Sequence, residues 1–166
     1  GTYWSPMQFS NKYNIECHER TTAKEIGYSV LRLEDAGTPR KLSALIAGSG
    51  TGGTIMGCHN HLIQLWSKMK TVLVKPAESA ETHGIQGIND GADFLCDMSK
   101  IDEVIIIKTN EAKERSCRLA KEAGLLVGIS SGANILAAER WVNKNNPEGI
   151  VITFLCDRGE RYLSCQ

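Results

Sequence analysis

Short runs of apolar, β-branched residues alternate along this chain with longer segments whose apolar positions recur at helical spacing. The short runs predict buried strands at residues 42–47, 71–74, 104–107 and 150–155. Helical patterns separate them, which is typical of a mainly parallel sheet covered on both faces. We therefore predict an α/β fold, a three-layer sandwich, whose ligands gather at the carboxyl ends of the strands.

Three helices are predicted from their start and stop signals. The first begins with Thr22-Ala23-Lys24-Glu25, which has the S/T-x-x-E form of a capping box. The second opens with Thr109 as the expected capping residue and ends at Gly124, since glycine tolerates the left-handed conformation common there. The third is expected to begin near Ser131 and to pass through Trp141.

Composition narrows the class of protein. The chain has 166 residues, of which 42% are hydrophobic, and this is enough for one core; we expect a single domain over residues 1–166. Nineteen basic residues balance nineteen acidic ones, so no excess positive charge favours nucleic acid. No apolar run approaches the roughly 20 residues needed to span a membrane, and no leader is evident. We expect a cytoplasmic protein without a membrane or nucleic-acid partner.

Cysteine and histidine spacing gives no sign of a metal site. The six cysteines are widely spread and never form C-x-x-C, so we expect reduced thiols rather than a disulfide framework. His59 and His61 would point to opposite sides of a helix, which is poor geometry for a shared metal. The sequence therefore predicts no metal ligand.

A glycine-rich loop carries the strongest chemical signal. The predicted strand 42–47 runs into Gly50-Thr51-Gly52-Gly53-Thr54, and a helical pattern follows. Glycines allow successive backbone N–H groups to point inward, and a helix start adds its positive end. The hydroxyls of Thr51 and Thr54 would add donors. The loop therefore predicts a phosphate site that needs no lysine or arginine.

Two other interpretations of the loop remain open at this point. It could be a tight strand-to-helix turn with no ligand. Gly48-x-Gly50-x-x-Gly53 also fits the dinucleotide pattern, yet the next predicted strand leads into Lys75-Pro76 instead of the expected acidic residue. A P-loop is excluded because no Gly-Lys-Ser/Thr ends the motif.

Six segments, in this order, carry a family resemblance. They are Gln8-Phe9-Ser10-Asn11, His18-Glu19-Arg20-Thr21-Thr22, Gly50-Thr51-Gly52-Gly53-Thr54, His83-Gly84-Ile85-Gln86-Gly87-Ile88, Gly124-Leu125-Leu126-Val127-Gly128-Ile129-Ser130-Ser131-Gly132-Ala133 and Asp157-Arg158-Gly159-Glu160-Arg161-Tyr162-Leu163-Ser164. Together they resemble the cysteine synthase family, which includes O-acetylserine sulfhydrylases and the catalytic core of cystathionine β-synthase. The resemblance implies the tryptophan-synthase-like fold and the cofactor pyridoxal 5'-phosphate (PLP).

The resemblance also implies roles for individual residues. Residues Gly50 to Thr54 match the loop that binds the cofactor phosphate. Ser130 matches the serine that hydrogen-bonds the pyridine nitrogen, and Gln8 matches a glutamine that contacts the substrate carboxylate. Gly87 lies in the match to a loop that lines the substrate side.

The hydroxyl of Ser130 has a chemical consequence at the position that the resemblance gives it. A neutral hydroxyl does not hold a proton on the ring nitrogen as a carboxylate would, so the ring is a weaker electron sink. This tuning favours loss of a β-substituent over prolonged carbanion chemistry. A plainer interpretation is that Ser130-Ser131-Gly132 caps the last helix, and the two roles are compatible.

The resemblance implies a β-replacement enzyme acting on a small amino-acid substrate. Cysteine synthase, which converts O-acetylserine and sulfide into cysteine and acetate, is the first hypothesis, with a homodimer at full length. Cystathionine β-synthase-like or cysteine desulfhydrase activity is the alternative within this class. A non-catalytic module that binds PLP or a partner is the alternative from another class.

The family's Schiff-base lysine has no counterpart among these residues. The family carries it in an N-terminal part whose motifs do not occur in this sequence. The lysines present are expected at solvent-facing edges, whereas a Schiff-base lysine should be desolvated beside the ring. We therefore expect residues 1–166 to be part of the cofactor-binding large domain of a longer enzyme, inactive alone and without a catalytic residue of its own.

Overall fold

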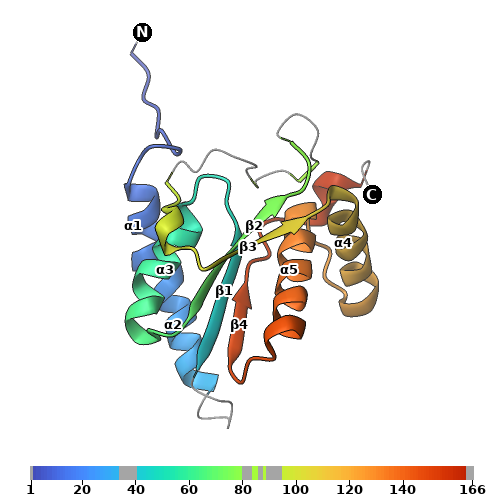
Figure 1. The fold of residues 1–166 in the computed structure, drawn as a ribbon. Coiled ribbons are helices and arrows are strands. Elements are labelled where there is room, and N and C mark those ends of the chain that lie inside the picture. The colour runs from blue at the N-terminus through green and yellow to red at the C-terminus, as the bar shows by residue number, and fades with distance from the viewer. Residues whose placement is uncertain (1, 34–40, 80–83, 86–87, 89–94, 164–166) are drawn as a thin grey trace.

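A computed structural model describes residues 2–33, 41–79, 84, 85, 88 and 95–163 (Figure 1). In this part of the chain, four strands form one sheet in the order β3-β2-β1-β4, and every neighbouring pair is parallel. The strands are β1 (Leu42–Gly48), β2 (Lys70–Pro76), β3 (Glu103–Ile107) and β4 (Ile150–Thr153). The predicted α/β class, the parallel sheet and all four predicted strands are confirmed.

Helices cover both faces of this sheet. The helices are α1 (Tyr13–Arg20), α2 (Thr22–Leu33), α3 (Gly53–Leu65), α4 (Thr109–Ala123) and α5 (Ile129–Asn145), with short 3-10 turns at Met98–Lys100 and Gly159–Tyr162. Helices α1, α2 and α3 lie on one side, while α4 and α5 lie on the other (Figure 1). The predicted three-layer arrangement is therefore confirmed.

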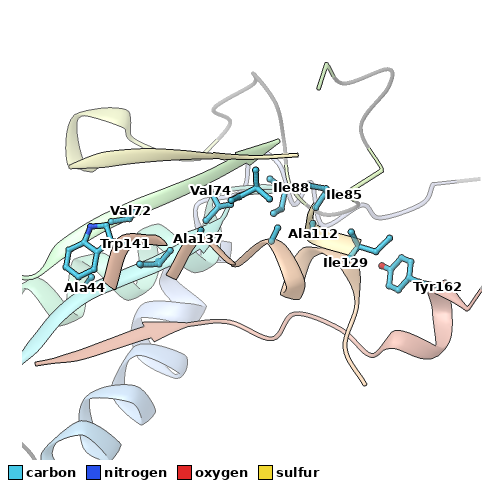
Figure 2. Packing of buried hydrophobic residues seen from close by; sticks show 13 residues of the cluster. Ala44, Val72, Val74, Ile85, Ile88, Ala112, Ile129, Ala137, Trp141 and Tyr162 are labelled. Carbon is cyan, nitrogen blue, oxygen red and sulfur yellow. The ribbon is translucent and has the colours of Figure 1, made fainter. Parts of the chain in front are cut away.

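Strand alternation supplies one apolar cluster to each helical layer. On β1, Leu45 and Ala47 pack in the cluster beneath α2 and α3, whereas Ala44 and Ile46 pack in the cluster beneath α5. Figure 2 shows the second cluster, where Trp141 lies near Ala44 at one end of the row. Because β1 is buried on both faces, the loop that follows it rests on a rigid base.

Helix α1 has no predicted counterpart. None of its residues is buried, so it lacks the apolar stripe by which a helix is found in a sequence. The prediction of a capping box at Thr22 is wrong. Helix α2 follows α1 almost without a break, and Glu25 N donates to the backbone carbonyl of Thr21, so Thr22 is already the first helical residue. The Thr22 hydroxyl instead lies 2.9 Å from His18 Nδ1.

The α4 start also differs from its predicted form. Lys108 occupies the capping position, and its N–H donates to the Glu111 carboxylate at 3.2 Å. Thr109 is the first helical residue, and its hydroxyl donates to the Glu78 carboxylate at 3.0 Å. The predicted C-terminal end of α4 is confirmed, since Gly124 follows the last helical residue with φ of 69°.

Helix α5 begins at Ile129, two residues before the predicted Ser131, with Gly128 as its capping residue. Its small residues allow close packing on α4, and Ser116 of α4 adds a buried hydrogen bond between the two elements. The Ser116 hydroxyl donates to Val127 O at 2.7 Å, just before α5. Across the described residues, no helix is long and apolar enough to cross a membrane.

We expect Ser116→Ala to lower the free energy of unfolding by about 1–3 kcal/mol, because Val127 O would lose its buried donor. Ser29→Ala is the matched control, since that hydroxyl bonds within its own helix at an exposed site. Its effect should stay within about 0.5 kcal/mol. Urea unfolding of both variants measures the difference, and equal effects would contradict the assignment.

Candidate functional site

A cavity of about 510 Å³ opens at the carboxyl ends of β1 and β4, the edge at which ligands of parallel sheets bind. One wall is the glycine-rich loop after β1. Gln8 and Phe9 approach from the N-terminal turn, while His18 and Thr22 contribute from the junction of α1 and α2. The opposite wall comes from α5 and the segment after β4. Segments distant in sequence therefore meet around one space of small-molecule size.

Two features hold the shape of the glycine loop: the backbone conformation of its glycines and the contacts that Asn14 of α1 makes with it. Gly52 has φ of 91°, in the left-handed region that favours glycine. A side chain at Gly53 would place its Cβ 2.0 Å from Asn14 Oδ1, so only glycine lets α1 approach this closely. The same asparagine donates from Nδ2 to Thr51 Oγ1 at 3.0 Å.

Thr51 is prepared to donate a hydrogen bond. Its hydroxyl oxygen accepts from Asn14 Nδ2 and, at 3.2 Å, from Gly53 N. With both lone pairs engaged, the hydroxyl proton is left for an acceptor in the cavity. The first-turn amides of α3 lie beside it, at the positive end of that helix. The loop thus has the donor chemistry of an anion site.

The opposite wall is held by the side chain of Asn134, which is 1% exposed. Its Oδ1 accepts from Gly48 N at 2.8 Å, and its Nδ2 donates to Phe154 O at 3.0 Å. The second bond takes the Phe154 carbonyl away from the sheet, which accounts for β4 ending at Thr153, earlier than predicted. One amide therefore ties the ends of β1 and β4 to α5.

Ser130 lies in the first turn of α5 and is 4% exposed. Its side chain lies beside the Cys156 thiol, which lines the cavity. Burial raises the pKa of Cys156, and the neighbouring Ser130 side chain opposes that rise. The neighbouring Ser131 hydroxyl accepts from Cys156 N at 2.9 Å. Since Gly128 is the capping residue, helix capping does not account for Ser130.

Asp157 fixes the start of α5 from the other side. Its Oδ2 accepts from the Tyr162 hydroxyl at 2.5 Å, and this bond raises the pKa of Tyr162. Its backbone carbonyl accepts from Gly128 N at 3.0 Å. Its Oδ1 is buried and has no hydrogen-bond partner among the described residues. It lies near Gly128 at the positive end of α5, which offsets part of the cost of that burial.

His18 joins the loop to the helical junction. Its Nε2 lies 3.1 Å from Thr54 Oγ1, and its Nδ1 lies 2.9 Å from Thr22 Oγ1. Burial lowers the pKa of His18 below its ordinary value of 6.5. The ring is therefore neutral at neutral pH, with one nitrogen donating and the other accepting.

The structure brings most of the sequence-predicted site residues together. Gly50, Thr51, Gly52, Thr54 and Gln8 line the cavity. Gly53, in the same loop, is buried and does not line the cavity. Ser130 does not line the cavity but lies beside Cys156, which does, and Gly87 lies outside the described residues. Among the described lining residues there is no lysine, and no group of described side chains is arranged to hold a metal.

Three polar residues of the site were not predicted: Asn14, His18 as a partner of Thr54, and Asn134. Their partners lie 37, 36 and 86 residues away in sequence. A usable signal existed only for Asn134, an asparagine within the apolar stretch of a predicted helix. Such a buried amide requires specific partners.

Comparison with known proteins assigns the class. Residues 1–157 match the model of the family described as pyridoxal-phosphate dependent enzyme, and the chain belongs to this family. A probable cysteine synthase of Bacillus subtilis is 38% identical over 96% of this chain and 52% of its own length. Cysteine synthase B of Campylobacter jejuni is 41% identical over 95% of this chain and 52% of its own length.

Solved structures agree with this assignment. A hydrogen sulfide-producing enzyme from Fusobacterium nucleatum aligns with a TM-score of 0.82 at 33% identity, over 98% of this chain and 55% of its own. An O-acetylserine dependent cystathionine β-synthase from Helicobacter pylori aligns with a TM-score of 0.83 at 31% identity, over 97% of this chain and 52% of its own. The tryptophan-synthase-like fold is thereby confirmed. The chain spans about half the length of the relatives it matches.

We expect Asn134→Ala to lower the free energy of unfolding by about 2–4 kcal/mol, because Gly48 N–H and Phe154 C=O would both lose their partner. Asn143→Ala, on an exposed part of the same helix, is the control and should change little. Chemical denaturation measures both variants. A small loss for Asn134→Ala would show that water replaces the amide.

The lowered pKa of His18 predicts a pH dependence of stability. The folded state binds the proton more weakly than the unfolded state, so this contribution is complete above 6.5 and declines as pH falls through 6.5 towards the lower folded-state pKa. Between about pH 7.5 and pH 5.5, the wild-type chain should lose more stability than His18→Gln. Burial also lowers the pKa of His59, but both proteins contain this residue, so its contribution cancels in the comparison. Equal losses would contradict the prediction.

Proposed function

We propose that this chain carries the PLP-binding part of a β-replacement enzyme of cysteine biosynthesis, cysteine synthase at full length. The observation that carries the proposal is one cavity bounded by the donor loop Gly50 to Thr54 on one side and by the wall that contains Cys156 on the other, with Ser130 beside Cys156. The cysteine synthases among its relatives support the choice of reaction.

The residues present fit PLP at both of its ends. A phosphate suits the Thr51 proton, the Thr54 hydroxyl and the amides at the start of α3, all of which are donors. The pyridine nitrogen is an acceptor, and Ser130 is a neutral donor beside Cys156, which lines the opposite wall. Bound PLP supplies an electron-accepting ring that promotes loss of a β-substituent from an amino acid.

Gln8 is proposed to hold the substrate carboxylate. It lines the cavity beside the glycine loop, and its backbone carbonyl accepts from Asn14 Nδ2 at 3.0 Å. Asn14 also holds Thr51, so one side chain fixes the spacing between the substrate residue and the phosphate loop. The backbone from which the Gln8 side-chain amide extends is therefore held at the edge of the cavity.

The proposed reaction forms a bond between the sulfur of sulfide and the β-carbon of O-acetylserine, while the β-carbon–oxygen bond breaks and acetate leaves. The covalent attachment of PLP requires a lysine amine, and no described lysine lines the cavity. We therefore assign cofactor and substrate binding to these residues, and turnover to the full-length protein alone. Gly87 on the substrate side stays a prediction.

Two related reactions are the alternatives. The Helicobacter pylori neighbour, an O-acetylserine dependent cystathionine β-synthase, favours a thiol acceptor larger than sulfide. The Fusobacterium nucleatum neighbour produces hydrogen sulfide, which favours cysteine as substrate. Assays of the full-length protein with O-acetylserine plus sulfide, with O-acetylserine plus homocysteine, and with cysteine alone separate them. Fastest turnover with sulfide supports cysteine synthase.

The proposal includes a homodimer in the cytoplasm for the full-length protein. Val104 and Ile106 leave apolar surface on edge strand β3, which suits a protein contact. The described cysteines Cys17, Cys58, Cys96, Cys117 and Cys156 are free thiols, which suits a reducing compartment.

Thr51→Val should weaken binding of inorganic phosphate and of PLP by roughly tenfold or more, because a hydrogen bond to a charged group is lost. Thr21→Val is the control, since its hydroxyl bonds an exposed backbone carbonyl of α1 and does not line the cavity. Isothermal titration measures both. If Thr51→Val bound phosphate and PLP with unchanged affinity, the Thr51 hydroxyl would not be part of the phosphate site.

A further inference from the structure

We propose that His18 is a positioning residue that aims the Thr54 hydroxyl at the anion in the cavity. It does so by adopting the tautomer in which Nε2 carries the proton and Nδ1 accepts. The inference rests on the proposed function, because it concerns the phosphate site of that function. It adds a residue that need not touch the ligand itself.

The hydrogen bonds around His18 can run in only two directions. In the first, Thr22 donates to Nδ1 and Nε2 donates to Thr54 Oγ1, so the Thr54 proton is free for the cavity. In the second, Thr54 donates to Nε2 and Nδ1 donates to Thr22, so the free proton belongs to Thr22. A neutral ring allows no third arrangement in which both bonds are kept.

The position of the two threonines decides between these directions. Thr54 lies in the first turn of α3, beside Thr51, whose own proton is already free. Thr22 begins α2, but Glu25 N there is already bonded to Thr21 O because α1 and α2 are almost continuous. The amide donors and the positive helix end are therefore concentrated at Thr54. An anion at that end selects the direction in which Thr54 donates to it.

Burial of the ring supports this assignment. Because burial lowers the pKa of His18, the ring is neutral at neutral pH and holds a single N–H. With a single N–H, the ring has one of two tautomers. In the proposed one, Nε2 carries the proton and Nδ1 accepts from the Thr22 hydroxyl. The relay Thr22–His18–Thr54 thus links the junction of two helices to the phosphate loop.

The first experiment reads the tautomer directly. Long-range proton–nitrogen spectra of the ¹⁵N-labelled 166-residue chain, recorded with inorganic phosphate and with PLP, report which ring nitrogen of His18 is protonated. We expect phosphate to shift the amides of Gly50 to Thr54 and His18 to show a protonated Nε2 and a bare Nδ1. If the loop amides shift while Nδ1 carries the proton, the inference is overturned and the proposed function stands. If neither ligand shifts the loop amides, the proposed phosphate site fails, and the inference fails with it.

A matched pair of variants tests the same relay by affinity. In His18→Gln the side-chain amide extends far enough to place an N–H near the ring Nε2 position, whereas the shorter side chain of His18→Asn stops near Nδ1. We expect His18→Gln to bind phosphate within about twofold of wild type and His18→Asn to bind about three- to tenfold more weakly. His61→Asn, on α3 and outside the cavity lining, controls for loss of a histidine.

Loop amide spectra without ligand report whether each variant keeps the fold. Equal affinity for the Gln and Asn variants, with intact folds, would show that Thr54 does not depend on His18. A merely structural role for the ring would lower the stability of both variants and leave their phosphate affinities alike. Either result overturns the inference. Weaker binding by the Asn variant alone supports it.

Discussion

The side chain of Asn134 is the constraint on which the cavity depends. Parallel strands diverge from the hydrogen-bonding pattern of the sheet at their carboxyl ends, and the groups released there need other partners. Asn134 supplies them for both β1 and β4, since it accepts from Gly48 N and donates to Phe154 O. The same amide therefore ends the ladder, fixes the start of the glycine loop and places α5 against the segment that bears Cys156.

Buried polar side chains continue this arrangement along α5. Ser131 and Asn134 are almost wholly buried, and each bonds the segment after β4 through a backbone group. A buried polar group without a partner costs free energy, so these residues permit only one register of α5 against the strand ends. Ser130 acquires its position from that register, because it precedes Ser131 in the same turn.

The strands, the fold class and the glycine loop could be predicted from the sequence because each has a local signal. Buried parallel strands are apolar runs, and the loop concentrates glycine and threonine in five residues. Helix α1 could not be found this way, since none of its residues is buried. The misassigned caps at Thr22 and Thr109 share one cause. Each hydroxyl bonds a side chain outside its own helix, His18 of α1 in one case and Glu78, 31 residues away, in the other, and the helix pattern does not reveal these partners.

The described lining of the site contains no lysine or arginine, so its donors depend on how they are supported. A lysine or arginine would hold an anion by charge alone, with little demand on geometry. Neutral hydroxyls and amides hold it only when their protons already point at it, so every donor needs a second residue behind it. Asn14 fills both lone pairs of Thr51 together with Gly53 N, and His18 contacts Thr54. The chain thus needs α1, although this helix contributes little to the core, because α1 supplies both supporting side chains.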